Sequence, residues 1–328
     1  MSLQTADDTL DGRAVAAADR PPQRPGRRRR IGRDGRAAWL YLAPAGLILL
    51  GVMVYPLYQL VQVSLFEYRQ AQVSGDAPIT FRGLANYLRL FTSSEFWRVL
   101  LATCGFTALC VFGSLVVGIL LAVLASRVRA LPRMLLFLAA LGAWATPAVA
   151  GSTVFLFLFH SDFGLVNELL VGLGFTGMEG FSWTYNPYVA FGLVGMEVIW
   201  CSFPFVLVTM YAGIKAIPSE VVEAASLDGA SMWRTARSVV LPMLRPLLII
   251  ATIQSIIWDF KIFTQIYVMT DGGGIAGRNL VLNVYAYQEA FAASNYALGS
   301  AIGVVMTALL LLITVVYLRA QRSKEDAI

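Results

Sequence analysis

Charged side chains are scarce in this chain: they make up 14% of its 328 residues, against about 25% in typical soluble domains. Hydrophobic residues reach 58%, and the mean hydropathy is +0.68. This combination excludes a disordered chain and argues against a soluble globular protein. Because six spans of about 20 residues use about 120 positions, the length suits a polytopic membrane protein with modest loops.

The residue types that carry most catalytic and metal chemistry are also few. The chain has one histidine, His160, and three cysteines, Cys104, Cys110 and Cys201, which all lie in apolar stretches. Their spacing matches no zinc or redox motif. The glycine run Gly272–Gly274 is not followed by Gly-Lys-Ser/Thr, and the chain has no Walker motif. We therefore expect no catalytic residue, no metal site and no ATP-binding site in this chain.

Residues 1–38 form a polar, basic segment before the first apolar stretch. The segment contains nine arginines, including the run Arg27–Arg30. A secretory signal peptide needs a short apolar region, and the stretch that begins at Trp39 is too long for one. We expect a disordered cytoplasmic tail, in which Arg27–Arg30 fixes the topology of a retained first span. Binding of nucleic acid or lipid by these arginines is the less favoured alternative, and we expect no nucleic-acid partner.

Six apolar stretches follow the tail, and each is long enough to cross a bilayer as a helix. They lie at about 39–66, 98–126, 133–160, 187–213, 247–270 and 294–318. With the tail inside, the inner segments carry 19 Lys and Arg residues, whereas the outer segments carry only Arg69, Arg82, Arg89, Arg98 and Arg278. The positive-inside rule therefore predicts that both termini are cytoplasmic.

The inner connection between the fourth and fifth stretches, residues 214–246, is long and mildly amphipathic. Its sequence predicts two short helices joined by a turn. Pro218 suits the start of the first helix, because a missing N–H costs nothing there. Asp228 is placed to cap the second helix, and Gly229 tolerates the turn. Such a segment is a candidate docking surface, and an ordinary interfacial loop is the alternative.

This connection resembles the EAA signature of binding-protein-dependent ABC importer permeases. The residues that match the signature are Glu223, Ala224, Ala225, Asp228, Gly229, Ala230, Leu241 and Pro242. The resemblance implies an all-α polytopic membrane protein with the type I ABC importer permease fold, six transmembrane helices and both termini inside. It also implies that residues 214–246 are the coupling segment, which sits in a groove of a cytoplasmic ATPase and transmits closure of the ATPases to the spans.

Further strings resemble the carbohydrate branch of that family, namely the maltose-type larger permease and its multiple-sugar and glycerol-phosphate relatives. They are Tyr41–Ala45, Phe81–Tyr87, Phe96-Trp97, Tyr267–Gly274 and Tyr285–Phe291, and in order they cover about residues 39–318. One position departs from the pattern. Gly274 stands where the family usually has proline, which implies a more flexible loop and puts the family role of Gly272–Gly274 in doubt.

The resemblance implies a permease subunit of an ATP-driven importer of a disaccharide or oligosaccharide in the bacterial plasma membrane. Its implied partners are a second permease, two cytoplasmic ATPase subunits, an extracytoplasmic solute-binding protein, membrane lipid and the sugar. ATP and Mg²⁺ belong to the ATPases, so the chain itself holds no cofactor. A glycerol-phosphate-type or other small polar solute is the alternative substrate. A membrane-integral enzyme or a secondary transporter is less favoured, because we find no cluster of catalytic groups and no clear internal repeat.

Polar residues inside the apolar stretches are candidates for the substrate path, because intramembrane polar groups are costly. In the fifth stretch the spacing predicts one shared helical face for Gln254, Trp258, Lys261 and Gln265. An aromatic ring beside hydrogen-bonding side chains suits a sugar, whose C–H face stacks on the ring while its hydroxyls form hydrogen bonds.

Asp259, together with Glu197 and Trp200 of the fourth stretch, completes the set of candidates. Asp259 and Lys261 lie about 200° apart around a helix and cannot pair within it. The hypothesis is that Glu197 neutralises Lys261 or the polar groups around Asp259 across a cavity. The alternative is that these groups make interhelical or intersubunit contacts without touching substrate.

Overall fold

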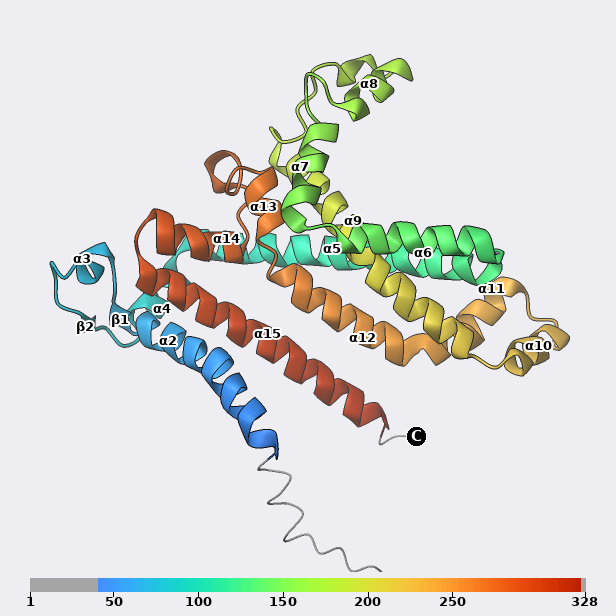
Figure 1. Ribbon diagram of the computed structural model, residues 1–328, viewed down its shortest axis with the longest axis horizontal. Helices are drawn as coiled ribbons and strands as arrows, with labels where there is room; N and C mark the ends of the chain where they lie inside the picture. Colours follow the sequence, from blue (N-terminus) through green and yellow to red (C-terminus); the bar gives the residue numbers. More distant parts are fainter. Residues whose placement is uncertain (1–40, 326–328) are drawn as a thin grey trace, which may run out of the picture. The chain divides into compact units, whose positions relative to one another are not determined.

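The computed structural model describes residues 41–325, most of which are helical (Figure 1). The predicted tail at 1–38, including Arg27–Arg30, lies outside the described residues. The chain divides into two units, residues 1–56 and 57–328. The described part of the first unit, 41–56, is helical and includes the π-helix η2 at Leu50–Val54. Its side chains are almost all exposed, as expected for a helix that faces lipid or another subunit.

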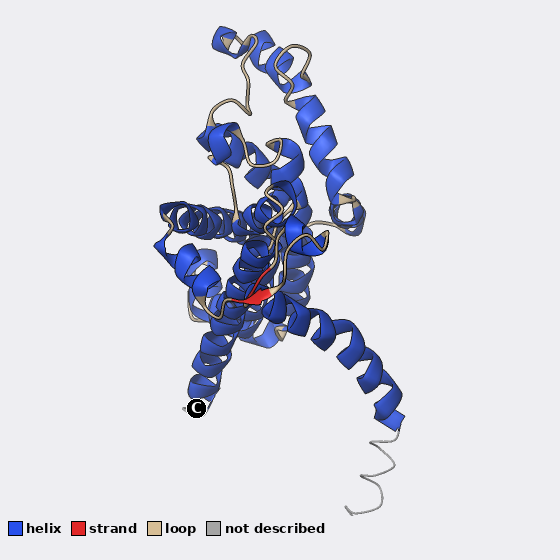
Figure 2. Ribbon diagram, turned by 90° about the vertical axis from the view of Figure 1, so that its left-hand side faces the viewer, coloured by secondary structure: helices blue, strands red, loops and turns tan. Residues whose placement is uncertain are grey.

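The elements that follow are helices with a single two-stranded sheet. In the first half they are α2 (Tyr55–Ser64), β1 (Phe66–Glu67), α3 (Gln70–Val73), β2 (Thr80–Phe81), α4 (Ala85–Thr92), α5 (Ser94–Arg127), α6 (Ala130–Ala145), α7 (Ala148–Leu158), α8 (Leu165–Gly172) and η3 (Thr176–Met178). In the second half they are α9 (Pro187–Ala216), α10 (Ser219–Leu227), α11 (Met232–Thr235), η4 (Ala236–Val240), α12 (Leu241–Phe260), α13 (Thr264–Met269), η5 (Ile275–Gly277), α14 (Leu282–Tyr287), η6 (Gln288–Ala292) and α15 (Tyr296–Glu325). Figure 2 shows the two antiparallel strands, in which Phe66 pairs with Phe81 and Glu67 with Thr80.

Five helices of the described chain are long and apolar enough to cross a membrane. They are Tyr41–Ser64, Ser94–Arg127, Pro187–Ala216, Trp233–Phe260 and Tyr296–Tyr317. The third predicted stretch, 133–160, is not one straight helix: α6 and α7 meet at an angle of 104°. Pro147 lies at this break as the residue before α7, since proline cannot supply the N–H that a continuous helix needs. The described chain therefore has five such spans, or six if the bent pair forms one.

The fifth predicted stretch, 247–270, is also displaced and interrupted. Its helix begins well before residue 247, because Trp233–Phe260 forms one long apolar helix. The helix then ends at Phe260, and the separate helix α13 begins at Thr264. The prediction of one continuous helix through residue 265 is therefore wrong.

The largest packed helix pair is α5 with α9, which lie against each other in Figure 1. Both helices begin with side-chain caps: Ser93 accepts from the N–H of Phe96, and Asn186 accepts from the N–H of Tyr188. Gly118 of α5 permits the close approach, because a Cβ there would lie 2.5 Å from Cβ of Val206. Small residues at a helix contact allow this kind of packing within a membrane.

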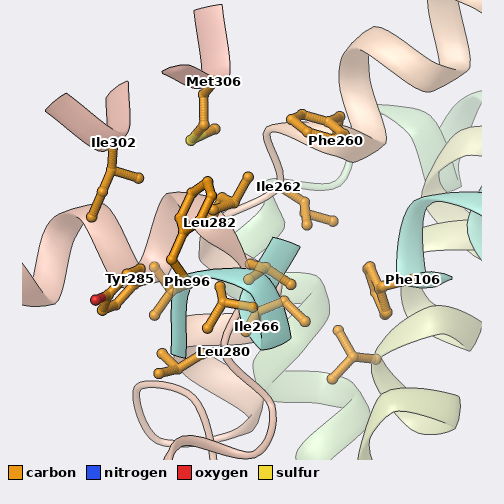
Figure 3. Close-up of a cluster of buried hydrophobic side chains, with 14 of the residues drawn as sticks. Phe96, Phe106, Phe260, Ile262, Ile266, Leu280, Leu282, Tyr285, Ile302 and Met306 are labelled. Carbon is orange, nitrogen blue, oxygen red and sulfur yellow. The ribbon is translucent and has the colours of Figure 1, made fainter. Parts of the chain in front are cut away.

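A cluster of buried hydrophobic side chains surrounds the short helices α13 and α14 (Figure 3). Its buried side chains come from α4, α5, α9, α12–α15 and the loops between α12 and α14, and include Phe96, Phe106, Phe260, Ile266, Leu282 and Ile302. A buried hydrogen bond of 2.9 Å, from the N–H of Leu282 to Oγ1 of Thr103, fixes α14 on α5. The short helices α13 and α14 are thus held firmly beside the break after Phe260.

The close contact at Gly118 predicts a large effect of a single methyl group. The change Gly118→Ala should lower the free energy of unfolding by about 1–3 kcal/mol, because the core must shift to admit the methyl. The measurement is thermal or denaturant unfolding of the purified protein in detergent. The matched control is Gly105→Ala in the same helix, where a Cβ meets nothing within 4 Å. Equal stability of the two variants would contradict the packing argument.

Candidate functional site

Glu223 to Ala230 of the EAA-like string lie in α10 and in the turn that follows it, whereas Leu241 and Pro242 begin α12. Glu223, Ala224 and Ala225 are in α10, and Asp228 ends the helix. The N–H of Ala230 donates to the carbonyl of Ala225 at 3.0 Å, and Gly229 has φ +75°. This is the arrangement of a Schellman C-cap, which requires a left-handed residue that glycine supplies without strain.

The next helix is capped by Ser231 and not, as the sequence predicted, by Asp228. The hydroxyl of Ser231 accepts from the N–H of Arg234 at 3.4 Å. The predicted second short helix is also wrong, because Trp233–Phe260 continues as one helix into the span. The π-helix η4 precedes Pro242, and its last bond runs from the N–H of Leu241 to the carbonyl of Ala236. Such a π-turn lets the helix continue past the proline.

The predicted coupling segment, residues 214–246, presents apolar side chains that nothing in the described chain covers. Leu227 is 89% exposed and Trp233 is 75% exposed, and Glu223, Ala224 and Asp228 are also exposed. On its other side is a cavity of about 330 Å³ lined by residues of α5 and of the coupling segment, among them Val123, Arg127, Val222 and Val240. Exposed Trp and Leu beside charged residues are typical of a protein contact surface.

A second cavity, of about 380 Å³, lies at the break between α12 and α13. Its lining includes four predicted candidates: Trp258, Asp259, Lys261 and Gln265. The lining residues that the sequence did not single out are Trp144, Val198, Cys201, Ser202, Ile262, Phe263 and Thr264. Trp144 comes from α6, directly before the bend at Pro147, and only the fold shows that this bend borders the cavity.

The predicted shared helical face is wrong, although the break brings most of its residues together. Lys261 is the first residue after α12, and Gln265 belongs to α13. The side-chain amide of Asn283 donates to the carbonyl of Lys261 at 2.7 Å. A broken helix inside a membrane is tolerated where side chains satisfy the freed backbone groups and where the break lines a cavity. Gln254 is not among the lining residues.

Trp258 and Asp259, which both line this cavity, differ in their exposure and in their contacts. Trp258 is 37% exposed, and its indole packs edge-on against Phe205 with ring centroids 5.1 Å apart. Asp259 is 3% exposed, and its Oδ2 atom has no hydrogen-bond partner among residues 41–325. Trp258 is therefore partly exposed, and the carboxyl group of Asp259 can accept a hydrogen bond or, when protonated, donate one.

Glu197 and Trp200 are not among the residues that line the cavity. Glu197 is fully buried, its Oε1 atom accepts from the thiol of Cys201 at 3.6 Å, and a Cβ at Gly151 of α7 would lie 2.8 Å from it. Trp200 packs against Phe155, with ring centroids 5.7 Å apart. Within the described part of the chain Glu197 forms no ion pair with Lys261, so the neutralisation hypothesis is wrong for this pair.

Side-chain hydrogen bonds connect the loop that contains the glycine run to other elements. The side-chain amide of Gln288 donates to the carbonyl of Gly272 within the run. Farther along the loop, Arg98 donates to the carbonyl of Gly277 at 3.0 Å, and Asn279 donates to the carbonyl of Pro187 at 2.7 Å. Gly274 has φ +74°, which proline cannot adopt because its ring fixes φ near −65°. Glycine at this position therefore suits a loop conformation that the family's proline would not permit.

The positive φ of Gly229 in the turn after α10 can be tested by adding a side chain there. A Cβ at Gly229 meets nothing within 4 Å, so Gly229→Ala should act only through the left-handed φ, at a cost of about 1–2 kcal/mol. Backbone amides of 224–235 should then exchange hydrogen roughly 5–30 times faster, as measured by mass spectrometry. Gly229→Asn is the matched control, because asparagine tolerates this region better. Equal exchange in the alanine variant and the wild type would contradict the prediction.

The amino-acid sequence is similar to those of known transport proteins. Residues 114–325 match the family of binding-protein-dependent transport system inner membrane components. The chain is 37% identical over 327 residues to the diacetylchitobiose uptake system permease protein DasB of Streptomyces coelicolor, with 99% of each chain covered. It is 31% identical to the trehalose/maltose transport system permease protein MalF of Thermococcus litoralis, over 90% of this chain and 96% of that one.

A solved structure shares the fold. It is a bacterial ABC transporter involved in the import of the acidic polysaccharide alginate, at 19% identity and a TM-score of 0.74, over 88% of this chain and 97% of that one. The fold class predicted from the sequence, that of a type I ABC importer permease, is confirmed. From the matching family model and the relatives above 30% identity, the chain belongs to the binding-protein-dependent transport system inner membrane components, which are multi-pass membrane transport subunits and not enzymes in themselves.

Proposed function

We propose that this chain is one of two permease subunits of an ATP-driven importer for a disaccharide or oligosaccharide. The observation that carries the proposal is the cavity of about 380 Å³ at the α12–α13 break, where an indole lies among hydroxyl, amide, amino and carboxyl groups. Sugars are bound by such combinations, since the ring stacks on the aromatic face and the hydroxyls need both donors and acceptors. Relatives named for diacetylchitobiose and for trehalose and maltose support the substrate class.

The second part of the proposal concerns coupling to ATP hydrolysis. Two cytoplasmic ATPase subunits bind the surface around Glu223, Leu227 and Trp233, and ATP and Mg²⁺ belong to them. The exposure of this surface supports the assignment. Because Trp233–Phe260 is one helix, movement of the ATPases at its beginning displaces Trp258 and Asp259 near its end. That displacement switches the cavity between the two sides of the membrane.

The remaining partners and the orientation complete the proposal. Both termini are cytoplasmic, with residues 1–38 as a topology-setting tail, since most Lys and Arg residues fall in the inner segments. A second permease covers the exposed apolar faces and shares the substrate path. An extracytoplasmic solute-binding protein delivers sugar to the outer connections. This last partner is supported by a solved structure of a bacterial alginate ABC transporter in complex with a periplasmic protein that holds an alginate pentasaccharide.

A second candidate substrate class is an anionic or glycerol-phosphate-type solute. The observation that favours it is Lys261, whose exposed side chain borders the cavity and forms no ion pair within residues 41–325. An unpaired ammonium group in a membrane cavity attracts an anion strongly.

The function is tested by purifying the tagged chain after expression with its operon neighbours, and by reconstituting the complex in liposomes. We expect an ATPase and a second permease to copurify, and ATP to drive uptake of labelled diacetylchitobiose, trehalose or maltose when the binding protein is present. The coupling variant Glu223→Ala/Gly229→Asp should lose the ATPase. Purification of the chain alone, or uptake that follows an ion gradient without ATP, would overturn the proposal.

The two substrate classes predict different effects of changes in the cavity. For a neutral sugar, Trp258→Ala should raise the KM of uptake about tenfold through lost stacking and burial, and Lys261→Gln should change it little. For an anionic solute, Lys261→Gln should reduce uptake at least tenfold while Lys261→Arg retains it. Phe112→Ala is the control for an exposed aromatic residue away from the cavity, because Phe112 is 69% exposed on α5. If all variants behave like this control, the cavity is not the substrate site.

A further inference from the structure

Three arginines surround a small cavity beside the β1–β2 hairpin. The cavity has a volume of about 190 Å³ and is lined by Arg69, Arg82 and Arg89, with Glu67 and Asn295 among its other residues. In the proposed orientation it lies on the outer side of the membrane. The positive-inside rule leaves few arginines on that side, and three of the five outer arginines converge on this one place.

Only one of these arginines has a carboxylate partner in the described chain. Nε and Nη2 of Arg82 donate to Oε2 of Glu67 at 3.0 and 2.6 Å, and this bonding lowers the pKa of Glu67. Arg69 and Arg89 form no ion pair with residues 41–325. Glu289 and Glu95 lie near Arg89 but do not line the cavity. Burial raises the pKa of Glu289, Arg89 lowers it, and Glu95 raises it. The lining therefore keeps an excess of positive charge, and Glu67 shows how a carboxylate bonds there.

The start of α15 adds to the positive potential of this cavity. Asn295 and Ala297, at the N-terminus of the helix, are lining residues, and the N–H of Ala297 donates to the carbonyl of Tyr68 at 3.1 Å. The 30-residue helix directs the positive end of its dipole toward the cavity. Positive groups thus come from three separate parts of the chain, which fixes their relative positions.

Exposed apolar side chains border the same hairpin and α4. Phe81 is 67% exposed, Leu84 is 71% exposed and Leu88 is 68% exposed. Arginine and aromatic residues are enriched where protein interfaces carry most of their binding energy. A small charged cavity next to an apolar rim fits one acidic side chain presented by a folded protein surface.

We propose that this arginine cavity receives an Asp or Glu side chain of the extracytoplasmic solute-binding protein and so anchors it to this subunit. The inference rests on the proposed function, since it requires that such a binding protein exists. Association with charged groups at an interface accelerates encounter and fixes orientation. The cavity would therefore set where the binding protein docks.

The test uses the complete complex in nanodiscs of phosphatidylcholine and the separately purified cognate binding protein. The variant Arg69→Gln/Arg89→Gln should weaken binding about tenfold at about 50 mM salt and flatten its salt dependence. The control Arg278→Gln changes an exposed outer arginine that does not line the cavity, and it should bind within about twofold of wild type. Unchanged copurification of the ATPase and the second permease shows that the variant complex is assembled.

A charge exchange identifies the partner group directly. Arg89→Glu should abolish most binding, and reversal of one acidic residue of the binding protein to arginine should restore it. Wild-type complex that binds no binding protein would contradict the proposed function itself. Normal binding with normal salt dependence in the double variant would overturn only this inference. A defect confined to nanodiscs containing phosphatidylglycerol would also overturn it, because the occupant would then be a lipid headgroup.

Discussion

The need to satisfy backbone hydrogen bonds within lipid is the constraint on which the rest of this structure depends. Long helices such as Ser94–Arg127 meet it internally. Within residues 41–325 the apolar helices are interrupted before Pro147 and after Phe260, and residues beside both breaks line the same cavity. The freed carbonyl of Lys261 is satisfied by the side chain of Asn283. Polar groups therefore collect where the helices are interrupted.

The continuity of the helix Trp233–Phe260 also affects how movement passes through the chain. The α10 turn ends at Gly229, and the helix Trp233–Phe260 then connects the exposed coupling segment to the cavity without a further break. A continuous helix transmits displacement along its length, whereas the Schellman turn allows α10 to present its own surface. The predicted coupling segment and the cavity at the α12–α13 break thus lie at the two ends of one helix. Buried contacts between α5 and α9, including that at Gly118, form the frame beside it.

The sequence anticipated much of the candidate site, but for partly wrong reasons. Trp258, Asp259, Lys261 and Gln265 do surround one cavity, yet not as one face of a helix, because the helix stops at Phe260. No glycine or proline marks this break, so local sequence gives no signal for it. Glu197 was selected as a costly intramembrane charge, and it is indeed buried, but its contacts are Cys201 and the small residue Gly151. Which neighbour a buried carboxyl group meets depends on helix packing that periodicity does not describe.

Hydropathy, charge asymmetry and the EAA-like string determined from sequence alone that this is a polytopic helical membrane protein with a long connection between its fourth and fifth apolar stretches. These properties are local, since they depend on burial in lipid and on short-range hydrogen bonding. Tertiary structure alone decided the 104° bend between α6 and α7, the break after Phe260 and the meeting of Arg69, Arg82 and Arg89 beside the start of α15. Pro147 marks the place of the bend but not its angle. The break after Phe260 and the gathering of the three arginines involve residues far apart in the chain, such as Asn283 beside Lys261 and Asn295 beside Arg69.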